Sequence, residues 1–274
     1  TKSLEPWKQI LAEIIQSDFF GVDRIDYLLR DSHHAGVGYG RFDHYRLLDT
    51  VRILPPPPAD ISEGVEATPA LGVERGGVQS AEQLLLARHY MFSGLYLHPI
   101  RRVYDVHLAD FLRAWLPGGV FSTDPDELLW MHDNRVLAAI EEAAGDPDAA
   151  GHDPARRIVK REHFRLLYEP SRADHRINLD AGAAIAEAAI EQFGSESVRH
   201  STYPPKDASV DFPVLLRGRV VPASSMIDVL TEVPPTRFDG VFVSPEQIDA
   251  ADRWLEDHKD AELEARQVEE EDEG

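Results

Sequence analysis

The residues from Gly21 to His34 include the side chains whose types and spacing best suit catalysis or ligand binding. Apolar residues at helical spacing predict a short amphipathic helix over this stretch. On its polar side Asp23, Tyr27 and Asp31 follow one another at intervals of four residues, so they line one wall. Two carboxylates and a phenol on one wall suit a metal ion and a sugar or phosphate hydroxyl. From spacing alone, a surface helix with Asp–Arg pairs is an equally good interpretation.

The same run, Gly-Val-Asp-Arg-Ile-Asp-Tyr-Leu-Leu-Arg-Asp, resembles the last motif of the HD-domain metal-dependent phosphohydrolases. It is similar to the branch that contains the deoxynucleoside triphosphate triphosphohydrolases. Only the first position departs, where Gly21 replaces an acidic residue that is not a metal ligand in the family. The resemblance implies that Asp23 is the last ligand of a divalent metal ion (Mn, Mg, Fe, Ni or Zn). It also implies that Arg24, Tyr27 and Asp31 bind the substrate.

A second run resembles another motif of that family, with Ala-Arg-His-Tyr-Met at residues 87–91 and Tyr-Leu-His at residues 96–98. Arg88, Phe92 and Tyr96 are four residues apart, so on a helix they share a face. The resemblance implies that Arg88 contacts the phosphates, that Tyr96 closes the nucleotide pocket and that His98 occupies the family's catalytic histidine position. For His98, a hydrogen-bonded core histidine is an equally good interpretation.

Pro99 follows this histidine at a position where relatives usually have lysine. Proline within a helix removes a hydrogen bond, so we expect a kink there. In relatives that a second nucleotide activates, the lysine lies at the regulatory pocket. The resemblance therefore does not extend to activation by an effector.

The first histidine and the His-Asp pair of the family, which precede the last motif, are absent from the sequence. His132 and Asp133 lie downstream of Asp23, in the wrong order, and their apolar flanks predict a helix that buries one face. Asp23 alone cannot hold a transition metal at useful affinity, because selectivity depends on ligand number and geometry. We therefore expect the chain to be the C-terminal portion of a longer protein.

The formal charge of −21 argues against a nucleic-acid partner, because phosphate backbones are bound by clustered Lys and Arg. The chain has no cysteine, which excludes disulfides and thiolate metal sites. It has no apolar run of membrane-spanning length and no recognisable signal peptide. We expect a soluble, cytoplasmic protein, and the resemblance implies a nucleotide substrate and a homo-oligomer.

The predicted fold is mainly α. Residues 1–162 form the C-terminal part of an HD-type helical domain with a two-stranded insertion, residues 163–258 form a small α+β lobe, and residues 259–274 form an acidic, disordered tail. The pattern predicts helices at 4–16, 80–115, 123–144, 180–194 and 246–257. It predicts strands at 45–54, 69–75, 163–168, 198–203 and 238–243, and a strand pair at 212–221 with a tight turn at 216–219.

Two further signals favour structural roles. The glycine-rich stretch Gly36 to Gly40 follows a helix rather than a strand, so we interpret it as a helix exit and not as a phosphate loop. The short helix after Asp153 carries a basic cluster, Arg156 to Arg161. We interpret this cluster as the usual complement of a helix dipole, although it could also hold an anion.

The leading hypothesis is a metal-dependent HD phosphohydrolase that hydrolyses (deoxy)nucleoside triphosphates to nucleoside and triphosphate. The alternatives are a non-catalytic nucleotide-binding or assembly module derived from such an enzyme, and an HD phosphohydrolase that acts on another phosphoester. Base preference, metal identity and effector stay open.

Overall fold

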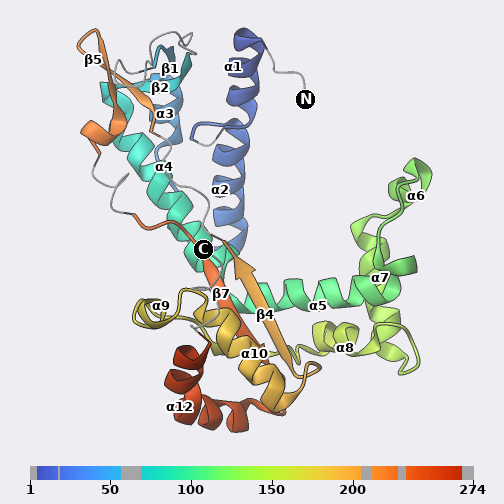
Figure 1. The fold of residues 1–274 in the computed structure, drawn as a ribbon. Coiled ribbons are helices and arrows are strands. Elements are labelled where there is room, and N and C mark those ends of the chain that lie inside the picture. The colour runs from blue at the N-terminus through green and yellow to red at the C-terminus, as the bar shows by residue number, and fades with distance from the viewer. Residues whose placement is uncertain (1–4, 18, 57–68, 205–210, 228–232, 267–274) are drawn as a thin grey trace. The chain divides into compact units, whose positions relative to one another are not determined.

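The structure, a computed structural model, describes residues 5–17, 19–56, 69–204, 211–227 and 233–266. Contacts divide the chain into two compact units (Figure 1). Unit 1 comprises Thr1–Tyr96 and Pro205–Thr236, and unit 2 comprises Leu97–Pro204 and Arg237–Gly274. Among the described residues, no helix is long and apolar enough to cross a membrane.

Unit 1 combines helices with a four-stranded sheet. Its helices are α1 (Pro6–Ile15), α2 (Val22–Ala35), α3 (His44–Thr50) and α4 (Val78–Met91), and α4 is followed by a π-helical turn, the π segment (Phe92–Tyr96). Its strands are β1 (Val51–Leu54), β2 (Ala70–Glu74), β5 (Pro213–Leu216) and β6 (Arg219–Pro222). The strand order is β1-β2-β5-β6, in which only the β2–β5 pair is parallel.

The core of unit 1 lies between α2, α3, α4 and this sheet. The side chains buried there include Leu28 from α2, Leu47 from α3, Leu84 and Met91 from α4, and Val214 from β5. In α2 the predicted apolar stripe is confirmed, because Ile25 and Leu28 are buried and Leu29 packs against the same core. The helix therefore presents its polar side away from the core.

Unit 2 contains the remaining elements. Its helices are α5 (Pro99–Trp115), α6 (Pro125–Trp130), α7 (Asp133–Gly145), α8 (His152–Lys160), α9 (Asp174–Ile177), α10 (Ala181–Phe193) and α12 (Ile248–Ala265). The strands β3 (Arg165–Tyr168), β4 (Val198–Tyr203) and β7 (Phe238–Val243) form an antiparallel sheet in the order β3-β7-β4.

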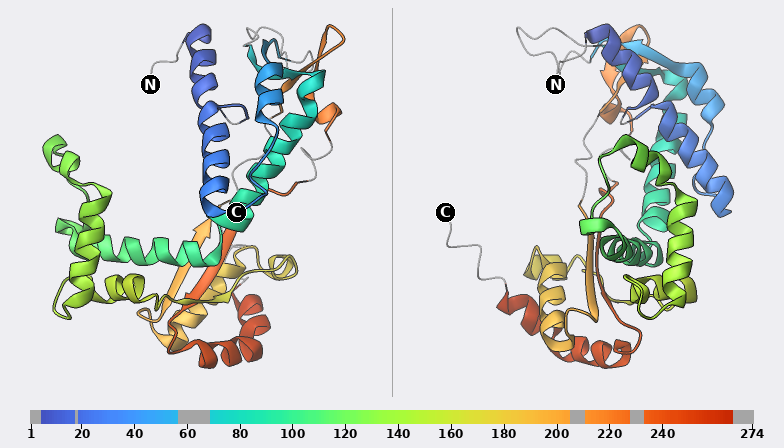
Figure 2. Two further views of the ribbon diagram at one scale, coloured as in Figure 1. Left: turned by 180° about the vertical axis from the view of Figure 1, so that it is seen from behind. Right: turned by 90° about the vertical axis from the view of Figure 1, so that its right-hand side faces the viewer.

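Helices cover both faces of this three-stranded sheet (Figure 2). α10 and α12 pack on one face, where Val198, Val241 and Val243 are buried with Ile185. α5 lies on the other face, because Arg102 donates to Ser201 Oγ at 2.7 Å and Arg199 donates to Asp110 at 2.8 Å. A mainly α fold with a small α+β part is therefore confirmed.

Several local predictions are also confirmed. The strands at 198–203 and 238–243 coincide with β4 and β7. The tight turn between β5 and β6 contains Arg217 (φ 50°) and Gly218 (φ 81°), the left-handed pair that a two-residue hairpin requires. Gly36 ends α2 with a φ of 71°, and Val37 N–H donates back to Ser32 O, which confirms the helix exit.

The predicted strand at 45–54 is wrong over its first half. Residues 44–50 form α3, because the Asp43 side chain accepts a hydrogen bond from Arg46 N at 3.0 Å and so caps a helix. Only Val51–Leu54 is a strand.

The predicted helix at 80–115 is two helices. α4 begins at Val78, two residues before the predicted start at Ser80, which is a buried residue within the helix. The helix ends before His98, because Pro99 begins α5 at a position where its missing N–H costs nothing. The expected disturbance at Pro99 is therefore a complete break.

The predicted helix at 123–144 is also interrupted. Asp124 caps α6, but the helix ends at Trp130 and a second helix, α7, follows, whose cap His132 accepts from Arg135 N through Nδ1 at 3.4 Å. The expected burial is wrong for the upstream flank, because Leu129 is 80% exposed and Trp130 is 68% exposed, whereas Val136 in the downstream flank packs against a buried cluster.

The predicted boundaries at 162 and 258 differ from the observed units. Residues 97–162 belong to unit 2, and the β5–β6 hairpin belongs to unit 1 because β5 pairs with β2. The predicted tail is helical as far as Ala265 in α12, where Arg266 pairs with Glu187, Glu191 and Glu262. Residues 267–274 lie outside the described part of the chain.

Candidate functional site

The polar side of α2 carries the predicted site residues of unit 1. Asp23 is exposed in the first turn of the helix, and its Oδ1 accepts a hydrogen bond from Arg24 N at 2.7 Å. A carboxylate in this position is stabilised by the helix dipole. Gly21 precedes it with little space, because a Cβ there would lie 2.5 Å from Ser17 N and 2.6 Å from Asp23 Oδ1. Glycine at this motif position therefore suits the path of the chain before the helix.

One turn further on, α2 meets the π segment. Tyr96 donates a hydrogen bond from its hydroxyl to Asp31 Oδ2 at 2.8 Å, across 65 residues of sequence. The ring of Tyr27 lies edge-on to Tyr96 with a centroid separation of 6.1 Å. Figure 1 shows that α2 and the C-terminal end of α4 approach each other. Tyr27, Asp31 and Tyr96 thus form one continuous surface.

Arg30 supports this surface from the solvent side. Its guanidinium donates to Asp26 Oδ2 from Nε at 3.1 Å and from Nη2 at 2.9 Å, while its Nη1 lies 3.6 Å from Asp31 Oδ1. The hydrogen bond from Arg30 to Asp26 raises the pKa of the guanidinium further. Asp31 therefore faces the phenol through one oxygen and a guanidinium through the other.

The π segment continues the site toward α4. The rings of Phe92 and Tyr96 meet edge to face at 5.0 Å, and Arg88 Cζ lies 5.2 Å from the centre of the Phe92 ring. The expectation that these three residues share a face is confirmed. Burial, followed by the hydrogen bond to Asp31, raises the pKa of Tyr96, so the phenol keeps its proton at neutral pH.

Two arginines are enclosed beside this surface. Arg24 is half-buried, and its Nη1 atom is shielded from solvent. Arg88 is also half-buried, and its Nε has no hydrogen-bond partner among the described residues. The enclosed Nε of Arg88 can therefore donate to an anionic ligand.

His98 belongs to unit 2. Its exposed ring caps α5, because Nδ1 accepts from Ile100 N at 3.2 Å. This is a structural role different from the core histidine considered above. The signal was present in the sequence, since a polar residue directly before a proline is a typical helix start.

Sequence reasoning missed the support that Tyr39 gives to the π segment. This residue is the aromatic one within the glycine-rich stretch, and its hydroxyl lies only 3.0 Å from the position that a Cβ on Gly94 would take. The same stretch approaches α4 at Gly40, where a Cβ would lie 2.7 Å from Met91 Sδ. The helix exit thus packs on the turn that carries Tyr96.

The basic cluster of α8 has structural partners. Arg157 is buried, donates from Nε to Asp153 at 2.7 Å and lies over the Phe164 ring at 4.7 Å. Arg156 pairs with Asp153 and Glu162. The helix begins at His152 after Gly151, one residue before the predicted start at Asp153. These contacts agree with the structural interpretation of the cluster.

No three metal-binding side chains come together within the described ranges. Asp23 therefore offers one carboxylate ligand, and the described residues do not form a complete metal site around it.

Residues 61–260 match the family described as the HD associated region, over more than half of the chain. The chain belongs to this family. A mainly α architecture in an HD-associated family agrees with the relationship to HD-domain proteins that the motifs indicated.

Two curated relatives are similar over part of their length. An uncharacterised protein of Methanocaldococcus jannaschii is 39% identical over 98 residues, which cover 36% of this chain and 20% of that protein. An uncharacterised protein of Bacillus subtilis is 25% identical over 177 residues, which cover 58% of this chain and 37% of that protein. The matched region thus spans well under half of either relative.

Solved structures share the fold. A hypothetical protein from Aquifex aeolicus superposes with a TM-score of 0.74 at 25% sequence identity, covering 92% of this chain and 61% of that one. A phosphohydrolase from Bacteroides thetaiotaomicron superposes with a TM-score of 0.57 at 19% identity, covering 86% of this chain and 64% of that one. The chain therefore corresponds to less than two thirds of each of these structures.

Proposed function

We propose that this chain forms part of a metal-dependent HD phosphohydrolase that hydrolyses (deoxy)nucleoside triphosphates to nucleoside and triphosphate. The observation that carries the proposal is the hydrogen bond between Tyr96 and Asp31, which joins the two motif segments on one surface. Membership of an HD-associated family and a fold shared with a protein named as a phosphohydrolase support it.

Asp23 is the proposed metal ligand on this surface. Further ligands would come from outside the described residues, because no group of three or more metal-binding side chains lies within them. When bound, a divalent metal ion polarises a phosphoryl oxygen and lowers the pKa of a coordinated water. The exposed position of Asp23 at the start of α2 leaves its carboxylate accessible to such an ion.

The other residues would bind and orient the nucleotide. Asp31 is a carboxylate already oriented by Tyr96 and Arg30, and we propose that it accepts a hydrogen bond from a sugar hydroxyl. Tyr27 would pack against the sugar beside it. Arg24 and Arg88 would donate to phosphate oxygens, as planar guanidinium groups do. The protonated phenol of Tyr96 would serve as a donor at the edge of the pocket.

Replacing Asp23 in the full-length protein tests the proposal. We expect Asp23→Ala to lower metal content and to slow triphosphate release by about a hundredfold or more, because a metal ligand is lost. Asp49→Ala is the matched control, since Asp49 is an exposed carboxylate on α3 in the same unit. The measurements are metal analysis of the purified protein and product analysis with nucleoside triphosphates and added Mn or Mg.

The outcomes separate the alternatives. Unchanged metal content and hydrolysis in Asp23→Ala would refute the proposal. Nucleotide binding without turnover and without metal dependence would favour a non-catalytic nucleotide-binding module. Hydrolysis of a different phosphoester, lost in Asp23→Ala, would retain the metal assignment and change the substrate.

A further inference from the structure

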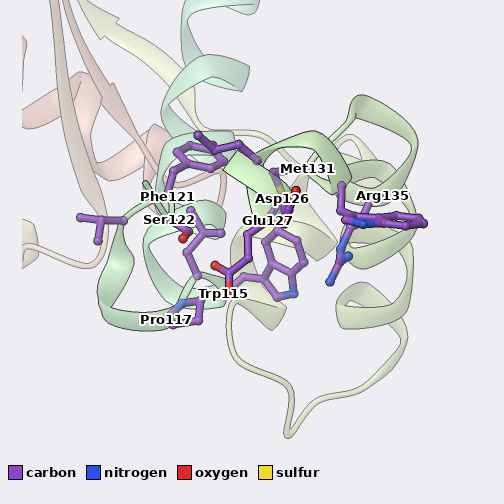
Figure 3. Close-up of a pocket in the computed structure, with 12 residues that line it drawn as sticks. Trp115, Pro117, Phe121, Ser122, Asp126, Glu127, Met131 and Arg135 are labelled. Atoms are coloured by element: carbon purple, nitrogen blue, oxygen red, sulfur yellow. The ribbon is translucent and has the colours of Figure 1, made fainter. Parts of the chain in front are cut away.

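An apolar groove lies in unit 2, between the end of α5 and helix α6 (Figure 3). It encloses about 750 Å³. Its apolar lining includes Trp115, Leu116, Phe121, Leu128, Trp130 and Met131. None of the proposed site residues lines it, so it is separate from the surface on α2.

The apolar side chains around the groove are unusually exposed. Val120 is 66% exposed, Phe121 48%, Leu128 46% and Trp130 68%, and all four line the groove. Single exposed apolar residues are common on soluble proteins, but a contiguous group of this kind marks a site of interaction. Tryptophan and methionine are also among the residues enriched in the centres of protein interfaces.

The floor of the groove is held by the core of unit 2. Trp115 stacks on Phe111 with a centroid separation of 5.7 Å and an interplanar angle of 15°. Phe111 is fully buried with Ala139, Ile140 and Ala155. The groove is therefore formed before any partner binds, which lowers the entropic cost of binding.

The rim of the groove carries more negative than positive charge. Between Ser122 and Arg135 the chain has four carboxylates and one arginine, Arg135, which also lines the groove (Figure 3). Asp124 uses its carboxylate to cap α6, accepting from Asp126 N at 2.9 Å and from Glu127 N at 3.2 Å. Asp126 and Glu127 line the groove itself.

We propose that this groove binds a cationic amphipathic segment of a partner protein. The apolar face of the segment would enter between Trp115 and Trp130, and its Lys or Arg side chains would face Asp126 and Glu127. Apolar anchors in a groove with complementary charges at its edge are the usual features of helix-in-groove recognition.

The charge of the rim favours a cationic segment over a second copy of the chain or an anionic membrane. A second copy of the chain would bring another formal −21 against an acidic rim. Anionic lipid headgroups would likewise be repelled by it, although tryptophan side chains often enter membrane surfaces. A cationic segment meets both the apolar lining and the acidic rim favourably.

The test uses the full chain and two synthetic helical peptides with the same leucine face, one carrying lysine and the other glutamate on its polar face. Binding is measured by isothermal titration calorimetry at physiological salt. We expect the lysine peptide to bind at least about tenfold more tightly than the glutamate peptide. We expect Trp130→Ala to weaken binding at least about tenfold, as loss of an interface tryptophan does.

Two variants sharpen the test. Trp7→Ala is the matched control, because Trp7 is 63% exposed on α1 in unit 1 and should leave binding unchanged. The double variant Asp126→Asn/Glu127→Gln should reduce the preference for lysine over glutamate. Equal binding of both peptides, or unchanged binding in Trp130→Ala, would overturn the proposal. So would a wild-type oligomer that dissociates in Trp130→Ala, because the groove would then bind a second copy.

Discussion

At the scale of single residues, the hydrogen bond from Tyr96 to Asp31 connects α2 to the π segment. Burial raises the pKa of Tyr96, so the phenol remains a donor throughout the neutral range. The 2.8 Å bond ends on a carboxylate that Arg30 also approaches at 3.6 Å. Removing the phenol oxygen therefore removes one of the two contacts that orient Asp31.

We expect Tyr96→Phe to lower the free energy of unfolding by about 1 to 2 kcal/mol, because a hydrogen bond to a charged group is lost. Tyr27→Phe is the control, since the ring of Tyr27 contacts Tyr96 through its edge, and its effect should stay below about 0.5 kcal/mol. Urea denaturation followed by circular dichroism measures both. Equal losses in the two variants would mean that the hydrogen bond from Tyr96 to Asp31 adds no stabilisation of its own.

Part of this site was predictable because three of its residues lie close together in the sequence, on one helix. Residues four apart on one helix must share a face, so the arrangement of Asp23, Tyr27 and Asp31 followed from the sequence. Contact between Asp31 and Tyr96 spans 65 residues and depends on a π-helical turn that no sequence pattern predicted. The capping role of His98 was encoded by the following proline but was overlooked.

At the scale of elements, the β5–β6 hairpin could be predicted from the local sequence, but its place in the sheet could not. Gly218 and its neighbours predict the turn, yet nothing local indicates that β5 pairs with β2, some 140 residues earlier in the chain. The pairing brings the backbone of Pro213 close to Gly72, where a Cβ would lie 2.0 Å from the Pro213 carbonyl oxygen. A side chain at residue 72 must therefore push the two strands apart.

We expect Gly72→Ala to destabilise unit 1 by about 2 to 3 kcal/mol, since backbone atoms cannot move aside as a side chain can. Gly38→Ala makes the same chemical change in the loop after α2, where nothing lies within 4 Å of the added Cβ. Its effect should stay within about 0.5 kcal/mol. Hydrogen exchange of the β2 amides, compared between the variants, gives the measurement. Unchanged protection in Gly72→Ala would contradict the close approach of the two strands.

At the scale of the whole molecule, acidic charge and buried histidine respond to pH in opposite ways. The formal charge is −21, so partial protonation of the carboxylates raises the stability of the folded chain, because the repulsion between them falls. His107 opposes this gain. It is 2% exposed, its Nε2 accepts from Phe164 N at 3.2 Å, and burial followed by the charge of Arg157 lowers its pKa to about 4.

The folded pKa of His107 lies below the ordinary value of 6.5, so the neutral ring favours folding. Its contribution to stability is complete above pH 6.5 and is lost as the pH falls toward 4. We expect His107→Gln, which keeps an acceptor for Phe164 N, to lose less stability than the wild type between pH 6.5 and 5. Urea midpoints of both proteins across this range provide the comparison. Parallel pH profiles would mean that the imidazole does not titrate differently on folding.

The chain leaves unit 1 after Tyr96, returns to it at Pro205 and leaves it again after Thr236. During synthesis on a ribosome, the segments that carry the candidate site emerge before unit 2, but β5 and β6 emerge only after most of unit 2. One edge of β2 in unit 1 therefore stays unpaired while more than a hundred further residues are translated. Its maturation is thus coupled in time to that of its neighbour, and a messenger truncated between the two would yield a half-built sheet.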